Sequence, residues 1–306
     1  MKLDEAAVSR LLRTEEVISA MEHALADFSS GRVVQPTRVM IPVAEHEGFL
    51  GLMPAYYAAG PALGVKLVAF YPQNRGIPTH HATILLFKPE TGEPLVNMDG
   101  RLITEVRTAA VSAVATKYLA RPDASVLAII GSGVQARSHL KALRLIRRFE
   151  EVRVWSPRRA EDFARRFSVR ASASAEEAVR GADVVVTATT SKTPVHFGEW
   201  LSPGTHINAV GAPRPDWREL DDETLRHARI YVDSREAALK ESGDVIAAGR
   251  IFAEVGEVVT GAKPGRQSAE EITLFKSLGL AVEDVATADL IYRKAANIAT
   301  AEESLR

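Results

Sequence analysis

The sequence predicts an α/β protein in which a doubly wound parallel sheet is joined to a smaller α+β domain with an antiparallel sheet. The apolar run Val126–Ile130 ends in Gly-x-Gly-x-x-Ala at residues 131–136, and a helix-like pattern follows at once. From there to residue 279, strand-like and helix-like segments alternate, which indicates a parallel sheet. Before residue 120, consecutive strand-like segments have short connectors, which indicates a largely antiparallel sheet.

The first domain begins with a helix over Thr14–Ser30, where Thr14 can act as the cap and apolar residues recur at helical spacing. Helical spacing returns over Ile103–Leu119, and Leu280–Ala299 reads as a long helix that packs back on this domain. The domain is therefore expected to be discontinuous, with residues 1–120 and 280–306. Its strands are expected at residues 33–43, 49–57, 63–71, 82–87 and 94–98.

The second domain, residues 121–279, carries the alternating pattern. Its first strand is a continuous apolar run, as is typical of strands that are buried on both faces. A helix is expected from residue 134, and a weaker strand lies near Val169. The other strands are expected at residues 126–130, 151–155, 183–188, 206–210, 230–233 and 272–275.

The glycine motif has the context of a Rossmann-type dinucleotide-binding turn. Gly131 permits a tight turn, Gly133 lets the backbone approach a pyrophosphate, and Ala136 lets the helix pack close to the strand. The free N–H groups at the helix start favour phosphate. Since ligands bind at the carboxyl ends of parallel strands, later strand ends join the site. The expected cofactor residues here are Gly131, Ser132, Gly133, Val134, Gln135, Thr187, Ala188, Thr189 and Val210.

The residues that follow the next expected strand, 151–155, distinguish an NAD site from an NADP site. NAD sites usually place Asp or Glu there, about 20 residues after the glycines, to accept from the ribose 2′-hydroxyl. This chain has Ser156, Arg158 and Arg159 instead, and no carboxylate until Glu161. Because guanidinium groups pair readily with phosphate, we favour NADPH. The alternative is that both arginines belong to a solvated helix start.

Three cations of the first domain occupy positions that the pattern assigns to the core. Arg107 lies on an apolar helix stripe, Lys66 shares a strand face with Val68, and Arg38 shares one with Met40. No single acidic residue is an obvious local partner for all three, and an unpaired buried charge is costly. We interpret the three as a clamp for a substrate carboxylate. The alternative is that each cation reaches solvent or pairs with its own distant acid.

Composition narrows the classes of partner. The net charge of −1 argues against nucleic acid, and no apolar run approaches the roughly 20 residues that span a bilayer. The chain lacks cysteine, an apolar leader at its start and any metal-binding spacing among its eight histidines. We therefore expect a cytoplasmic protein without a metal site, membrane contact or nucleic-acid partner.

The chain resembles the ornithine cyclodeaminase/mu-crystallin family, and most closely its mu-crystallin, or ketimine reductase, branch. The segments that carry the resemblance are residues 51–56, 107–113, 131–136, 206–212, 214–221, 236–244 and 276–284. The resemblance implies a homodimer with a substrate and dimerisation domain, NADPH as cofactor, and reduction of cyclic ketimine carboxylates by hydride transfer to C=N. It places Arg38, Lys66 and Arg107 at the substrate, and Thr79, His80 and Ser277 near the cofactor or active site. Among these, Lys66 and Arg107 are our candidate catalytic residues.

One departure from the family pattern separates its activities. Where cyclodeaminases resemble Gly-Gly-Asp-x-Pro-Gly with a catalytic aspartate, this chain has Pro213 at the aspartate position, and proline cannot accept a proton. That disfavours ornithine cyclisation. Two alternatives stay open: an NADP-linked alanine-type dehydrogenase, and a non-enzymatic, NADPH-dependent thyroid-hormone-binding protein. The family's mu-crystallin branch has serine at the position of Pro213, so the missing hydroxyl counts against thyroid-hormone binding. Lys66 is our first candidate proton donor because burial lowers a lysine pKa, with water as the rival.

Overall fold

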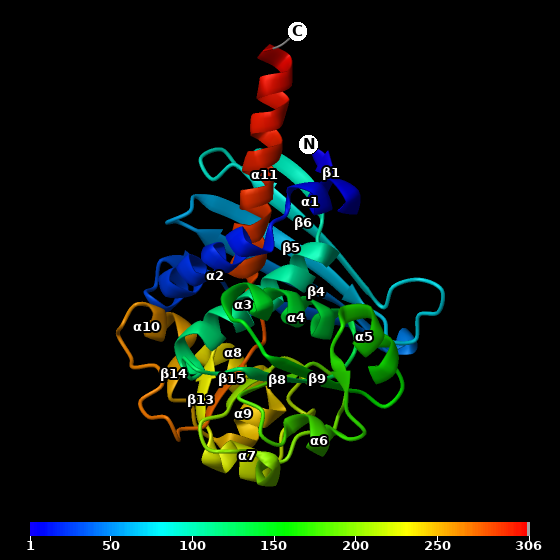
Figure 1. Ribbon diagram of the computed structural model, residues 1–306. Helices are drawn as coiled ribbons and strands as arrows, with labels where there is room; N and C mark the ends of the chain where they lie inside the picture. The colour runs from blue at the N-terminus through cyan, green and yellow to red at the C-terminus, as the bar shows by residue number, and fades with distance from the viewer. Residues whose placement is uncertain (305–306) are drawn as a thin grey trace. The chain divides into compact units, whose positions relative to one another are not determined.

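The computed structural model describes residues 1–304, with the side chains of 299 and 301–304 left out (Figure 1). The chain divides into two units, residues 1–107 with 280–306, and residues 108–279. The expected boundary after residue 120 differs from this division because helix α3 (Arg101–Leu119) continues without a break from one unit into the other.

The first unit is built on a seven-stranded sheet in the order β1-β7-β6-β5-β4-β2, with β3 also paired to β4. All its pairs are antiparallel except β1 with β7. Besides the start of α3, its elements are β1 (Lys2–Leu3), α1 (Glu5–Leu11), α2 (Thr14–Ser29), β2 (Val33–Val34), β3 (Val39–Val43), η1 (Ala44–His46), β4 (Gly48–Tyr57), β5 (Ala62–Phe70), β6 (His80–Phe87), β7 (Pro94–Asp99) and α11 (Ala281–Ser304).

Helix α11 packs on β4, β5 and β6, and also contacts α2 (Figure 1). Its close approach depends on Gly64 in β5, where an added Cβ would meet the Leu85 carbonyl oxygen at 2.7 Å and Val285 of α11 at 3.2 Å. Alternation along the strands puts Met53, Lys66 and Ile84 side by side on the buried face, since these three are cross-strand partners. The sheet and α11 thus bring an ammonium group into an apolar layer.

One expectation for the first unit is wrong. Residues 33–43 do not form one strand, because residues 35–38 leave the sheet between β2 and β3. Arg38 therefore shares no strand face with Met40, and Met40 is itself exposed. The polar pair Gln35 and Thr37 around Pro36 accounts for the break, since proline donates no ladder hydrogen bond. The Gln35 side chain instead accepts from the Val282 N–H at the start of α11.

The second unit is an eight-stranded, wholly parallel sheet in the order β10-β9-β8-β11-β12-β15-β13-β14. The predicted doubly wound sheet is confirmed. Its elements are β8 (Val126–Ile130), α4 (Val134–Ile146), β9 (Glu151–Trp155), α5 (Ala160–Phe167), β10 (Arg170–Ala171), α6 (Ala175–Val179), β11 (Val184–Thr187), η2 (Gly198–Trp200), β12 (His206–Ala209), α7 (Asp222–His227), β13 (Arg229–Val232), α8 (Arg235–Glu241), α9 (Gly243–Ala248), β14 (Ala253–Glu254), α10 (Val255–Val259) and β15 (Thr273–Lys276).

The central strands of this sheet are buried along their length, as the apolar runs in the sequence predict. Their carboxyl ends all meet at one edge because every pair is parallel. The turns after β8, β9, β11, β12 and β15 therefore gather there. The expected cofactor residues of this unit lie in these turns, except Thr187, which ends β11, and Val134 and Gln135, which begin α4.

Candidate functional site

The turn after β8 has the geometry of a phosphate cradle. Gly131 has φ +123°, and a Cβ there would meet the Ala188 carbonyl oxygen at 2.4 Å, so only glycine fits. Gly133 is the N-cap of α4 without any side-chain cap bond, and no heavy atom lies within 4 Å of a Cβ built on it. The first N–H groups of α4 and the space beside Gly133 fit a pyrophosphate at a helix N-terminus.

Two more motif residues contribute to this cradle. Val134 is 54% exposed in the first turn of α4, where an aromatic ring of a cofactor can cover it. The Gln135 side-chain oxygen is buried without a hydrogen-bond partner among the described residues. Both features agree with a bound dinucleotide at this turn.

The segment after β9 lies beside the glycine turn. The Ser156 hydroxyl donates to the Ser132 hydroxyl at 2.8 Å and accepts from the Arg159 backbone N–H at 3.3 Å. The side chains of Arg158 and Arg159 are exposed. Two hydroxyls and two exposed guanidinium groups thus lie at the position where an NAD site presents a carboxylate.

The later strand ends are organised by a carboxylate that our sequence interpretation does not include. Glu219, fully buried, accepts from the Thr187 hydroxyl, from the Thr189 backbone and hydroxyl, and from the Gly211 backbone. Val210 follows β12, and Ser277 follows β15, where its N–H donates to the Ala209 carbonyl. Glu219 lies within residues 214–221, one of the segments that carry the family resemblance, but the sequence alone assigned it no role.

In the first unit, Lys66 and Arg107 lie together around one acid. The Lys66 ammonium donates to Asp284 at 2.5 Å, and the Arg107 Nε donates to the other oxygen of the same carboxylate at 2.9 Å. The Arg107 Nη1 also donates to Glu283 at 2.6 Å. All four side chains are buried. Asp284 and Glu283 come from α11, more than 170 residues away along the chain, so sequence spacing could not have indicated them.

The pKa values within this cluster differ from the ordinary ones for physical reasons. Burial lowers the pKa of Lys66 to about 8, and Arg107 and Arg38 act in the same direction against Asp284. Burial alone would raise the pKa of Asp284, but Arg107 and Lys66 outweigh it and hold that pKa below its usual value. Asp284 is therefore ionised at neutral pH. Lys66 titrates just above neutral pH.

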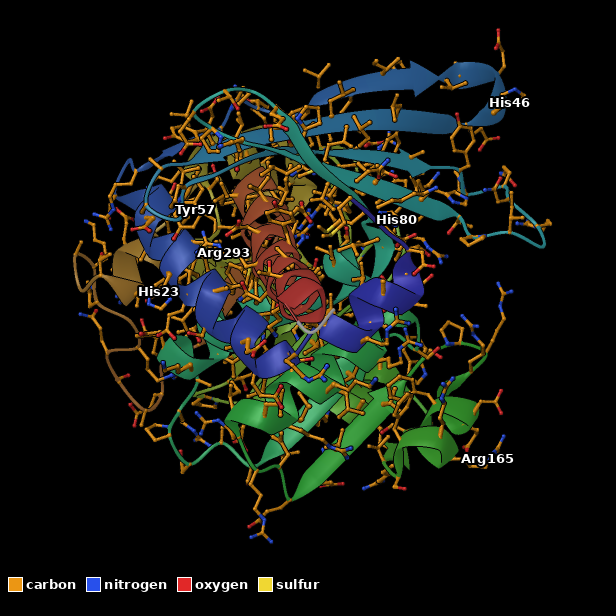
Figure 2. All side chains as sticks on the ribbon, turned by 90° about the horizontal axis from the view of Figure 1, so that it is seen from above. His23, His46, Tyr57, His80, Arg165 and Arg293 are labelled. Carbon is orange, nitrogen blue, oxygen red and sulfur yellow. The ribbon has the colours of Figure 1, made fainter. Side chains whose placement is uncertain are left out.

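His80 begins β6, as Figure 2 shows, and lies in the field of the same cluster. Burial, then Lys66 and then Arg107 lower its pKa to about 4, so its imidazole is neutral at pH 7. Thr79, next to it, is exposed, and its carbonyl accepts from the Tyr71 N–H. His80 thus joins the cation cluster, whereas Ser277 belongs to the second unit.

These contacts change the expected clamp. Two of its three cations are paired with internal carboxylates, and the absence of an obvious local acid is explained by Asp284, which is distant in sequence. Arg38 lies near enough to the cluster to lower the Lys66 pKa. Among the described residues, hydrogen bonds to Asp284 and Glu283 occupy one Lys66 donor and two of the five Arg107 donors.

The described residues contain neither a cluster of metal ligands nor a helix suited to cross a membrane. Within residues 1–304, no three histidine, aspartate or glutamate side chains are placed to hold a metal ion together. Among the helices in that range, none combines the length and apolar character needed to cross a membrane.

Comparisons with known proteins cover nearly the whole chain. Residues 1–298 match the model of the ornithine cyclodeaminase/mu-crystallin family. The ketimine reductase mu-crystallin of Rattus norvegicus is 56% identical over 286 residues, which are 90% of this chain and 91% of that protein.

Two solved structures are similar in fold as well as in sequence. The Thermococcus litoralis Delta(1)-pyrroline-2-carboxylate reductase in complex with NADH and L-proline is 42% identical with a TM-score of 0.93, covering 98% of both chains. An archaeal alanine dehydrogenase dimer with bound NAD is 39% identical with a TM-score of 0.91, covering 97% of this chain and 96% of that one.

Proposed function

The chain belongs to the ornithine cyclodeaminase/mu-crystallin family, and we propose that it is an NADPH-dependent reductase of cyclic ketimine carboxylates. The substrate class we propose is a small ring with C=N next to a carboxylate, such as pyrroline-2-carboxylate or piperideine-2-carboxylate. The observation that carries the proposal is the pair of buried cations Lys66 and Arg107, which Asp284 holds side by side, with Arg38 near enough to lower the Lys66 pKa. Guanidinium donors beside an ammonium group suit a carboxylate. The names of the relatives agree with this reaction.

The residues of the first unit have separate parts in this reaction. The unused Arg107 donors and Arg38 hold the substrate carboxylate, since guanidinium binds carboxylate through paired hydrogen bonds. Asp284 fixes the Arg107 guanidinium and the Lys66 ammonium in place. Lys66, with a pKa of about 8, gives its proton to the imine nitrogen. The reduced nicotinamide supplies the hydride that the C=N carbon accepts.

In the second unit, the cofactor residues are those of the strand-end turns. The α4 N-terminus with Gly131, Ser132 and Gly133 holds the pyrophosphate, as its free N–H groups and open space support. Thr187, Ala188, Thr189 and Val210 follow the strands toward the nicotinamide half, together with Ser277.

The preference for NADPH rests on this chain's own residues, because the similar solved structures are described with NADH or NAD. Ser156, Arg158 and Arg159 offer donors to a 2′-phosphate. Replacing Ser156→Asp together with Arg158→Ala introduces a repelling carboxylate and removes a cation. We expect the ratio of kcat/KM for NADPH over NADH to fall at least tenfold, about 1.4 kcal/mol. An unchanged ratio in steady-state assays would refute the assignment.

A substrate panel tests the reaction itself. Purified protein with NADPH is offered five- and six-membered cyclic imine carboxylates, then pyruvate with ammonia, then ornithine, and absorbance at the nicotinamide band is followed. We expect oxidation of NADPH with the cyclic imines at least 100-fold faster than with the other two. Ornithine turnover with ammonia release is not expected because Pro213 lies where cyclodeaminases have their aspartate.

Alanine dehydrogenation is the second candidate, and the similarity to an archaeal alanine dehydrogenase favours it. The same cations would hold pyruvate, so the panel separates the two by ammonia dependence. Fast, ammonia-dependent oxidation of NADPH with pyruvate, without turnover of the cyclic imines, would replace our proposal by this one. Binding of iodothyronines without any turnover would instead favour the non-enzymatic alternative.

We also propose a homodimer that uses the edge of the first unit's sheet. Val34, Val39 and Ile41, on the short strands β2 and β3, are 66%, 55% and 48% exposed, an apolar group that is unusual at a free edge. The archaeal relative is described as a dimer. Sedimentation equilibrium should give a dimer mass, and Ile41→Lys should shift it to the monomer. A monomeric wild-type protein at micromolar concentration would overturn this part.

A further inference from the structure

We propose that Glu219, Asp244 and Lys276 form a positioning network that holds the strand ends of the second unit in the geometry required for hydride transfer. The inference rests on the proposed function, since it concerns the part of the unit assigned to the nicotinamide. All three side chains are fully buried, and none belongs to the glycine motif or to the cation cluster.

Glu219 connects two strand ends through a single carboxylate. Its Oε2 accepts from the Thr187 hydroxyl at 2.8 Å and from the Gly211 N–H at 2.8 Å. Its Oε1 accepts from the Thr189 N–H at 2.8 Å and from the Thr189 hydroxyl at 2.6 Å. Four donors face the two oxygens, and a carboxylate accepts at all four positions, whereas an amide would place its own donors against half of them. The exit of β11 and the loop after β12 are thereby tied together.

Lys276 and Asp244 close the network into a ring. The Lys276 ammonium donates to the Gly211 carbonyl at 2.5 Å and to Asp244 at 2.9 Å. The other oxygen of Asp244 accepts from the backbone N–H of Glu219 at 3.1 Å and of Leu220 at 3.2 Å. Both polar backbone groups of Gly211 are therefore held, one by the carboxylate and one by the ammonium.

The loop that this ring holds is strained. Ala212, the next residue, has φ +52°, one of three positive values among the non-glycine residues of the described chain. Such a conformation persists only where the surroundings fix it. A Cβ on Gly211 would meet the Glu219 carboxylate at 2.4 Å and the Thr189 carbonyl at 2.4 Å, so the carboxylate also demands glycine here. Pro213 follows directly, at the position that separates the family's activities.

The unfavourable free energy of burying these three charged side chains points to a role beyond folding. Two buried carboxylates share one buried ammonium, and burial raises the pKa of Glu219 against the effects of Lys276 and the hydroxyl donors. A core made of apolar side chains would be at least as stable as a buried ion pair. Hydride transfer needs the donor and acceptor carbons about 3–3.5 Å apart, and a misplacement of about 1 Å can lower the rate about 100-fold. Fixed strand ends supply that constraint.

The test replaces Glu219 by glutamine and separates kcat from binding. We expect Glu219→Gln to lower kcat for the cyclic imine at least tenfold, while the imine KM and the NADPH Kd stay within threefold of wild type. The matched control is Glu223→Gln, the same change at an exposed acid four residues later, which should leave all three unchanged. A kcat within twofold of wild type, or a loss of kcat matched by an equal rise in the NADPH Kd, would overturn the proposal.

If Glu219→Gln does not fold, Asp244→Asn carries the same test, because it keeps the shape of the side chain and removes the charge that pairs with Lys276. We expect a three- to tenfold lower kcat with unchanged KM and Kd, and no change in kcat would overturn the proposal.

Failure of the proposed function has a different signature, since wild type and Glu223→Gln would then turn over none of the imines. The network is then tested by amide hydrogen exchange with and without NADPH. Wild type should be protected by NADPH at residues 131–136, 187–189 and 210–212, and Glu219→Gln only at residues 131–136. Equal protection of all three segments in the variant would overturn the inference.

Discussion

The Lys66 ammonium is the side chain whose protonation state has most influence on the first unit. Burial favours its neutral form and Asp284 favours its charged form, and the balance leaves a pKa of about 8. The charged form is the one that binds an anion and donates a proton. Binding of a carboxylate should therefore be constant below this pKa and weaken as pH rises through it.

Asp284→Asn tests this balance. Removal of the neighbouring negative charge lowers the Lys66 pKa further, so the pH above which an anionic ligand binds weakly should move down by at least one unit. The measurement is the pH dependence of the inhibition constant of cyclopentanecarboxylate, which has no group that titrates between pH 6 and 10.

A matched control lies on the same helix. Asp289 pairs with Arg293 of α11 at 2.8 Å, outside the cluster. Asp289→Asn should leave the pH profile of wild type unchanged. If Asp284→Asn and Asp289→Asn give the same profile, Lys66 is not the group that titrates.

At the scale of elements, the turn between β8 and α4 depends on one glycine. A side chain at Gly131 would both occupy a disfavoured conformation and clash with the Ala188 carbonyl. We expect Gly131→Ala to destabilise the fold by about 1–3 kcal/mol and to weaken NADPH binding at least tenfold. Denaturant unfolding and calorimetric titration measure the two effects.

Gly181 provides the comparison for this turn. It also has a positive φ, +72°, but an added Cβ would meet nothing within 4 Å. Gly181→Ala should therefore destabilise the protein by about 1 kcal/mol and leave the NADPH Kd unchanged. Equal loss of NADPH affinity in the two variants would show that the turn has no special part in binding.

The same elements show what the sequence can predict. The glycine turn, the central parallel strands and the helices α2, α3, α4 and α11 are local patterns, and their predicted positions lie within a few residues of the observed bounds. The shorter helices α1 and α5 to α10 and the two-residue strands β1 and β14 were not predicted. Asp284 and Glu219 act through contacts across the fold, so local pattern could not identify them. Arg38 was assigned to a strand because Val33 to Val43 is rich in β-branched residues, but Pro36 interrupts the ladder.

At the scale of the whole molecule, buried histidines predict acid lability. His139, His196 and His206 are fully buried, and burial lowers their pKa values to about 4, 4 and 3. In the unfolded chain each titrates near about 6.5. Between pH about 4 and about 6.5, the unfolded state therefore binds more protons than the folded state. The contribution of these histidines to the free energy of unfolding is fully present above pH about 6.5 and is lost as the pH falls toward about 4.

Urea unfolding at a series of pH values measures this loss. Burial also lowers the pKa of His80 to about 4. At the steepest point, four protons taken up on unfolding therefore correspond to about 5 kcal/mol per pH unit. The exposed His46→Gln should leave the slope unchanged, whereas His139→Leu with Ser112→Ala, which removes one hydrogen-bonded histidine, should reduce it by about a quarter. A stability that is flat from pH 7 to 4.5 would show that these histidines do not control it.

The central claim is that cations of the first unit bind the carboxylate of the imine, and one comparison tests it most directly. The kcat/KM values for pyrroline-2-carboxylate and for 2-methyl-1-pyrroline, which lacks the carboxylate, are measured in wild type and in Arg107→Lys, which keeps the charge but loses the paired donors. We predict that wild type prefers the carboxylate substrate at least 100-fold and that the variant loses at least tenfold of this preference, through the carboxylate substrate alone. The same preference in both proteins would contradict the account.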